Sequence, residues 1–327
     1  MGGYAFSALA AEVSKAGGLG FVSTIADMGQ ADRELSNARD LLHAIDAPAN
    51  VLPVGIGFLL FIAPLDEAAA VIRKHRPAAA WLFAAKSLDD YATWTRAIRA
   101  ASPATRVWIQ TGSVGAALRV AAACAPDVLV VQGADAGGHG AERSAGVIAL
   151  LPEARDALEA GGFGGVALVA AGGIADGRGV AAALVLGAQG VVMGTRFLAA
   201  AETPVPPGYR RRVLEASDGA RSTVRDKIFD QLRGKNIWPV EYDGRALVND
   251  SYVDFKNGMA LEEIQKLYAE AEQESEKGFG NGDGKARAAM WAGAGVGLVN
   301  KVQPAGEIVK EIRAAAKKAL SAGAKLA

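Results

Sequence analysis

The sequence predicts an α/β fold: a (β/α)8 barrel that lacks its first strand and carries a helical lid insertion. Short apolar runs alternate with amphipathic helical stretches up to about residue 197. This alternation implies a parallel sheet with right-handed crossovers. The 327 residues suit a barrel of ~250 residues with an insertion, in one domain. Glycine-rich loops follow three of the predicted strands, which places the chemistry at the strand ends.

Seven strands are predicted, each followed by a helix or a loop. The strands are expected at residues 20–25, 51–60, 79–84, 106–110, 128–131, 166–170 and 190–193. The helices are expected at residues 6–15, 30–45, 65–75, 88–101, 114–124, 148–160 and 180–186. A closed barrel of this class needs eight strands. Because the first helix begins almost at Met1, either the barrel is open at one seam or the sequence starts at an internal methionine.

The chain changes character after the predicted barrel core at residues 1–202. A proline-rich break, TPVPPGYRRR, opens residues 203–290, which we interpret as a helical lid over the barrel mouth. Residues 261–271 give this segment an amphipathic helix. Residues 291–327 are expected to return to the barrel and to end in a closing amphipathic helix at 305–320.

Composition points to small-molecule chemistry. Lys plus Arg (35) equal Asp plus Glu (35), so no net field attracts nucleic acid or an anionic membrane. No apolar run approaches the ~20 residues of a membrane span, and no basic-then-apolar leader follows Met1. We therefore expect a cytoplasmic protein with no nucleic-acid or membrane partner. The single cysteine, Cys124, is expected to be structural, and His43 and His75 to be solvated or packed helical residues.

The stretch VLVVQGADAGGHG at residues 128–140 organises the predicted site. Its apolar run is typical of a buried parallel strand, and it ends in a glycine-rich loop carrying Asp135, Gly137, Gly138 and His139. His139 alone among the three histidines lies outside a helical pattern. An imidazole at that place suits proton transfer near neutral pH, and a structural hydrogen bond is the alternative. For Asp135 we favour a structural role.

Two later loops are candidates for holding a phosphate. They read AAGGIADGRG at residues 170–179 and MGTR at residues 193–196. Glycines let backbone N–H groups approach phosphate oxygens, and the N-terminus of the following helix favours negative charge. Neither loop has the GK[ST] ending of a Walker loop or a well-placed GxGxxG fingerprint. A single phosphate, as in FMN or a sugar phosphate, fits better, with simple tight turns as the alternative.

These motifs together carry a resemblance. Residues 14–22 (SKAGGLGFV), 132–140 (QGADAGGHG) and 170–197 resemble the nitronate monooxygenase family, formerly called 2-nitropropane dioxygenases. DQLRGKNIWPVEYDGR at residues 230–245 is similar to the fungal-type branch. The resemblance implies an FMN-dependent TIM barrel that oxidises alkyl nitronates with O₂, giving a carbonyl compound and nitrite without a metal.

The resemblance also assigns residues. FMN would contact Gln132, Gly137, Gly138, Gly172, Gly173, Met193, Gly194 and Thr195. His139 falls at the family's catalytic histidine, which takes the α-proton of a neutral nitroalkane or holds the nitronate. The chain departs from the family in two places: only Met1 remains of a Pro-Met pair that borders the flavin, and residues 54–58 (VGIGF) lack the asparagine of bacterial members.

Some alternatives stay open. The lid residues Trp238, Tyr242 and Arg245 could line the pocket, although we favour packing at the surface. A second enzyme class is an NAD(P)H-dependent FMN reductase of quinones or enoyl thioesters. A third interpretation is a truncated, weakly flavin-binding barrel without catalysis. The sequence leaves a homodimer open.

Overall fold

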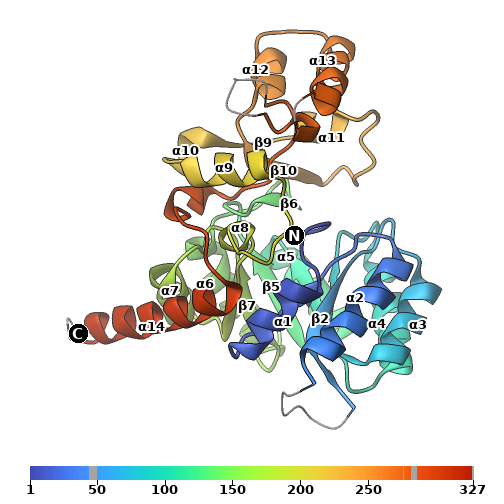
Figure 1. The fold of residues 1–327 in the computed structure, drawn as a ribbon. Helices are drawn as coiled ribbons and strands as arrows, with labels where there is room; N and C mark the ends of the chain where they lie inside the picture. Colours follow the sequence, from blue (N-terminus) through green and yellow to red (C-terminus); the bar gives the residue numbers. More distant parts are fainter. Residues whose placement is uncertain (44–49, 275, 281–285, 326–327) are drawn as a thin grey trace.

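A seven-stranded parallel sheet forms the body of the protein. The computed structural model describes residues 1–43, 50–274, 276–280 and 286–325 (Figure 1). The strands follow one another in chain order, β1-β2-β3-β4-β5-β7-β8. Their bounds are β1 Phe21–Val22, β2 Leu52–Leu59, β3 Pro77–Phe83, β4 Arg106–Thr111, β5 Val128–Gln132, β7 Ala167–Ala171 and β8 Gly190–Val192. All seven predicted strands are confirmed, and in the described residues the curled sheet stays open because its two end strands, β8 and β1, do not pair.

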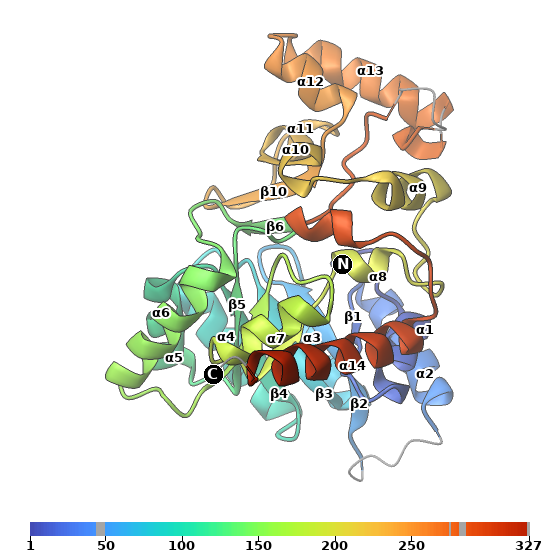
Figure 2. The same ribbon diagram turned by 90° about the vertical axis from the view of Figure 1, so that its left-hand side faces the viewer.

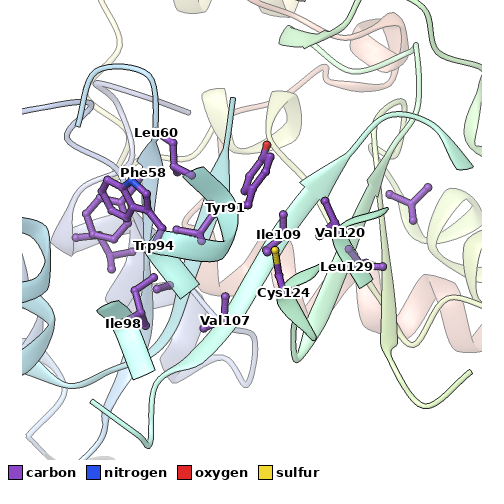
Figure 3. Close-up of a cluster of buried hydrophobic side chains, with 14 of the residues drawn as sticks. Phe58, Leu60, Tyr91, Trp94, Ile98, Val107, Ile109, Val120, Cys124 and Leu129 are labelled. Atoms are coloured by element: carbon purple, nitrogen blue, oxygen red, sulfur yellow. The ribbon is translucent and has the colours of Figure 1, made fainter. Parts of the chain in front are cut away.

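Helices cover the outside of the curled sheet. Their bounds are α1 Ser7–Lys15, α2 Met28–Leu41, α3 Leu65–His75, α4 Leu88–Ala101, α5 Val114–Cys124, α6 Val147–Ala160 and α7 Gly177–Val185. Between sheet and helices lies the largest apolar core, shown in part in Figure 3. Ile98 and Leu129 are fully buried there, and Cys124 is 4% exposed, in agreement with its structural role. Each such aliphatic side chain contributes about 1.5–3 kcal/mol by burial.

Aromatic side chains from β1, β3 and β4 pack against one another on one face of the sheet. Phe21 packs against Trp81 and Trp108, with ring centroids 5.3 and 5.2 Å apart. A side chain on Gly55 of the neighbouring strand would collide with Phe21, since its Cβ would lie 2.2 Å from Cε1. The interior is therefore a packed core, which leaves the carboxyl ends of the strands for chemistry.

The C-terminal helix α14 (Ala305–Gly323) covers the open seam. It crosses the barrel between α7 and α1 (Figure 2). Ala305 and Ile308 of α14 are buried against Leu9 of α1 and Phe197, which lies beyond β8. Apolar packing therefore takes the place of strand pairing at this seam.

A second body stands over the carboxyl ends of the strands (Figures 1 and 2). It contains α9 Pro207–Glu215, α10 Gly219–Ser222, β9 Thr223–Asp226, α11 Ile228–Gln231, β10 Tyr242–Leu247, α12 Asp250–Lys256 and α13 Leu261–Glu274. A short three-stranded antiparallel sheet, ordered β6-β10-β9, links it to the barrel through β6 (Gly138–Ala141). The prediction of a purely helical segment missed β9 and β10, because polar residues alternate irregularly in both strands. The division into lid and barrel stays a prediction.

Within the described part of the chain, no helix combines the length and the apolar character that crossing a membrane requires.

Candidate active site

His139 lies on a strand at the mouth of the barrel. The chain leaves β5 at Gln132, turns, and enters β6, where His139 stands opposite Gly244 of β10. The prediction of a glycine-rich loop is therefore wrong for Gly138 and His139. The local sequence GHGA has little strand preference, and β6 exists because the distant strand β10 supplies its hydrogen-bond partners.

The imidazole of His139 is enclosed on three sides. Its Nε2 lies 2.6 Å from Oδ1 of Asp230 in α11. The ring stacks on Trp238 at a centroid distance of 3.6 Å and an interplanar angle of 8°. Trp291 lies on another side at 4.6 Å. The amide of Gln132 donates a hydrogen bond to the backbone carbonyl of His139 (3.2 Å), which ties the histidine to the end of β5.

The second body, which stands over the strand ends, therefore contributes side chains directly to the site. The surface-packing explanation is wrong for Trp238, which stacks on His139, while Tyr242 packs edge-on against Phe83 at 5.2 Å. Arg245 donates to the backbone carbonyl of Ala134 at 3.2 Å. Sequence reasoning did not identify Asp230 or Trp291 as neighbours of His139. Asp230 opens the motif at residues 230–245, so the fungal-type resemblance was a usable signal for it.

The predicted glycine loops lie against the turn between β5 and β6. Gly172 and Gly173 both have positive φ values, +100° and +74°. A Cβ on Gly172 would lie 2.7 Å from the carbonyl oxygen of Gly133, and one on Gly173 would lie 2.9 Å from Cβ of Asp135. Glycine is thus required at both positions, for conformation and for space.

A segment that was expected to return to the barrel, but not to reach the site, completes this rim. The N–H of Gly293 donates to Oγ1 of Thr195 (2.9 Å), and the N–H of Ala294 donates to the carbonyl of Asp135 (2.9 Å). A Cβ on Gly137 would lie 2.3 Å from the backbone nitrogen of Gly293. Residues 293–294 therefore hold the β5–β6 turn and the β8 loop together.

Unpaired backbone donors mark the two predicted phosphate loops. Within the described residues, the N–H groups of Gly173, Ile174, Gly194 and Thr195 donate no hydrogen bond to the protein. Backbone N–H groups without partners are rare in folded proteins unless water or a ligand satisfies them. Such donors on adjacent loops suit the oxygens of one phosphate.

The N-terminus of α7 was expected to favour the phosphate, but Asp176 already caps it. Its Oδ1 accepts from the N–H groups of Arg178 (2.9 Å) and Gly179 (3.2 Å). The carboxylate thus takes up the helix-end donors, and the loop donors before it stay free.

The other residues predicted to contact FMN lie near the open seam between β8 and β1. Met193 is half-buried beside the cluster that α14 covers. A Cβ on Gly194 would lie 3.8 Å from Cγ of Met1, so the first residue borders this loop. The structure thus brings the N-terminus to the β8 end of the predicted site.

A cavity of about 500 Å³ lies beside this site, between the ends of β3 and β4 and the lid. Phe83 and Tyr242 belong to its wall, and both contact Trp238. Its other lining residues include Tyr91, Gln110, Thr111, Arg119 and Arg143. Neither His139 nor any residue predicted to contact FMN lines it, and its wall approaches the site through Phe83 and Tyr242.

Burial changes the pKa values of three side chains near the site, Tyr91, Tyr242 and Arg245. Burial raises the pKa of Tyr242 and, more strongly, that of Tyr91, so both phenols stay protonated. Burial, and next the neighbouring Arg225, lowers the pKa of Arg245. Arg225 itself pairs with Asp243, with Nε 2.9 Å from Oδ1. Among the described residues, no group of three or more His, Cys, Asp and Glu side chains is arranged to hold a metal ion.

Known proteins are similar to this chain in sequence and in fold. A family model described as nitronate monooxygenase matches residues 1–314. The chain is 46% identical over 312 residues to the nitronate monooxygenase npaC of Metarhizium robertsii, covering 93% of this chain and 86% of that protein. It is 41% identical over 331 residues to a nitronate monooxygenase of Neurospora crassa, covering 94% and 85%.

Solved structures support the barrel. FabK from Thermotoga maritima superposes with a TM-score of 0.75 at 24% identity, covering 100% of this chain and 94% of that one. A nitroalkane oxidase from Streptomyces ansochromogenes gives 0.71 at 24% identity, covering 98% and 94%. These two likenesses show the fold alone. The sequence matches, which span nearly the whole chain, favour neither the reductase nor the non-catalytic alternative. The chain belongs to the nitronate monooxygenase family.

Proposed function

We propose that this protein binds FMN and oxidises alkyl nitronates with O₂, giving a carbonyl compound and nitrite, and that it also accepts neutral nitroalkanes. One observation carries the proposal: His139 stands at the barrel mouth beside a rim of unpaired backbone N–H donors. The first feature suits proton transfer at carbon, and the second suits the phosphate of a flavin.

The residues at the rim fit FMN. The unpaired N–H groups of Gly173, Ile174, Gly194 and Thr195 would hold its phosphate. The glycines at 172 and 173 leave no side chain between the backbone and the ligand. Gln132 and the turn at 137–138 would border the isoalloxazine ring. Bound FMN supplies the redox chemistry, which accepts electrons from the nitronate and passes them to O₂.

His139 does the acid–base work of the protein. It would take the α-proton of a neutral nitroalkane and, once charged, hold the nitronate anion by ion pairing. Trp238 and Trp291 contact two sides of its ring and hold it in place. The cavity beside the site gives room for the alkyl part of the substrate, at about 500 Å³.

Spectroscopy and product analysis test the proposal together. The purified protein is expected to show a flavin spectrum, to respond to anaerobic titration with propionate 3-nitronate, and to form nitrite in air. Protein that stays colourless after FMN is added would contradict the cofactor. Rapid bleaching by NADH without nitronate turnover would contradict the reaction and support a reductase.

Two sequence-based expectations remain predictions alongside this function. The cytoplasmic location is tested by fractionating cells that express the full chain. The homodimer left open by the sequence is tested by light scattering of the FMN-loaded protein.

A further inference from the structure

Asp230 is the charged partner of His139, and it comes from a distant part of the chain. The two residues are 91 positions apart, and Oδ1 of Asp230 lies 2.6 Å from Nε2 of His139. Both side chains are largely buried, at 6% and 12% exposure. A buried carboxylate needs hydrogen-bonded partners, because desolvation of its charge is costly. The second oxygen of Asp230, Oδ2, is buried without a partner, so the contact with His139 is its chief compensation.

The other charged groups near His139 are occupied elsewhere. Arg225, close to Gly140, binds Asp243 and the backbone carbonyl of Ala141. Arg245, on the adjacent strand, donates to the carbonyl of Ala134 and to Thr223. The faces of the ring meet Trp238 and Trp291, which carry no charge. Among the described residues, Asp230 is thus the only charged side chain that contacts this imidazole.

The pairing decides which nitrogen can act as the base. An ionised carboxylate only accepts hydrogen bonds, so Nε2 of the neutral imidazole must carry the proton and donate it to Asp230. Nδ1 is then the nitrogen with the free lone pair. In the described structure Nδ1 makes no hydrogen bond, and it is not among the buried polar atoms left without a partner, so solvent or a ligand can reach it.

We propose that Asp230 is a positioning residue that holds His139 in the Nε2–H tautomer and directs Nδ1 toward the substrate. This inference rests on the proposed function and deepens it. Nδ1 takes the α-proton of a neutral nitroalkane, and the electron pair of the broken C–H bond moves into the C=N bond of the nitronate. The products are a nitronate anion and an imidazolium. Asp230 faces this cation and stabilises it, as carboxylates do in Ser-His-Asp triads.

Nitrogen NMR of the histidine rings tests the tautomer without using activity. The chain has three histidines, so ¹⁵N-histidine labelling gives a simple spectrum. Wild-type FMN-loaded protein is expected to show His139 protonated at Nε2 and bare at Nδ1 near neutral pH. In Asp230→Asn, the amide can donate to Nε2, and the proton is expected to move to Nδ1. Asp230→Ala is expected to leave a mixture of tautomers.

Kinetics of the same variants test the consequence. Asp230→Asn is expected to slow the turnover of a neutral nitroalkane by about 10²-fold or more, with a much smaller effect on pre-formed nitronate. Asp32→Asn is the matched control. It alters the other His–Asp contact of the chain, His75–Asp32, and should change neither rate.

The outcomes distinguish a failure of the role of Asp230 from a failure of the proposed function. A wild-type spectrum with the proton on Nδ1, or Asn and Ala variants that keep the wild-type ratio of nitroalkane to nitronate rates, would overturn the role of Asp230. Protein that binds FMN but oxidises no nitronate would overturn the proposed function, while the NMR result would still report on the tautomer.

Discussion

Among the described residues, two histidines contact the carboxylate of an aspartate, and the surroundings of the two pairs differ. His75 lies at the end of α3, with Nε2 2.8 Å from Oδ1 of Asp32. Its side chain is 3% exposed, and its Nδ1 is buried without a partner. Asp32 is 34% exposed and also binds Lys74. The His75–Asp32 pair thus connects α2 and α3, and neither ring nitrogen of His75 is open to a ligand.

The pair at the barrel mouth has the opposite arrangement. In His139–Asp230 the carboxylate is the more buried partner, no lysine or arginine of the described residues shares it, and Nδ1 of the histidine is open. The same two residue types therefore give a helix–helix contact in one place and a candidate proton acceptor in the other. Access to the second nitrogen distinguishes them, not the hydrogen bond itself.

The largest expected effect comes from removing the imidazole at the mouth. His139→Ala is expected to retain FMN and to slow turnover of neutral nitroalkanes by ~10²-fold or more, with a smaller loss on pre-formed nitronates. Steady-state nitrite release from both substrates measures this. Equal losses on both would mean that His139 positions the substrate rather than deprotonating it. His75→Ala, which lies far from the mouth, should leave the ratio of the two rates unchanged.

A substitution in the turn before His139 is expected to have the next largest effect. In Gly137→Ala the new methyl group would lie 2.3 Å from the nitrogen of Gly293, so the turn or residues 293–294 must move. The expected result is weaker FMN retention, measured as the flavin-to-protein absorbance ratio after gel filtration. Gly165→Ala is the control, because nothing lies within 4 Å of its Cβ. Equal flavin content in both variants would contradict the proposed rim.

Stacking is a further difference between the two histidines. Trp238→Leu removes the ring that lies 3.6 Å from His139 and keeps an apolar side chain. We expect roughly a tenfold loss of nitroalkane turnover, since stacked pairs contribute about 0.5–1.5 kcal/mol beyond burial. Ile237→Leu, at a neighbouring exposed position, is the control. An unchanged rate for Trp238→Leu would show that the stack does not orient the imidazole.

The smallest effect is expected from the His75–Asp32 contact between α2 and α3. Hydrogen bonds from Lys74 and next from His75 lower the pKa of Asp32 below its usual value. A carboxyl group with a lowered folded-state pKa stabilises the protein above its unfolded pKa of about 3.9, and this stability is lost as pH falls through the folded value. Asp32→Asn should therefore lower Tm at pH 7, with a difference from wild type that shrinks below about pH 4. A constant difference across that range would contradict a charge-based contact.

Regular patterns explain why the barrel could be predicted. Runs such as Val128–Val131 are apolar without interruption, and capped helices such as the one from Leu88 follow them at short distances. The loops at Gly172 and Gly194 could be found because adjacent parallel strands bring their carboxyl ends together. Local sequence contains all of this information.

The features that could not be predicted from the sequence depend on contacts between distant segments. The contact between Asp230 and His139 depends on the pairing of β6 with β10, whose register no local pattern encodes. Trp238 lies in a polar stretch with scattered aromatics, which resembles an exposed loop. The occupied N-terminus of α7 was missed because Asp176 is equally compatible with a helix cap and with a ligand loop.

The pairing of β6 with β10 also bears on how the chain acquires its site during folding. Contacts that join residues 91 positions apart close a large loop, and such contacts form late compared with local ones. A nascent chain that has emerged only as far as β8 already holds all seven barrel strands, but it has neither Asp230 nor the strand that orders His139. The contact between His139 and Asp230 therefore assembles only after the chain has been synthesised through β10.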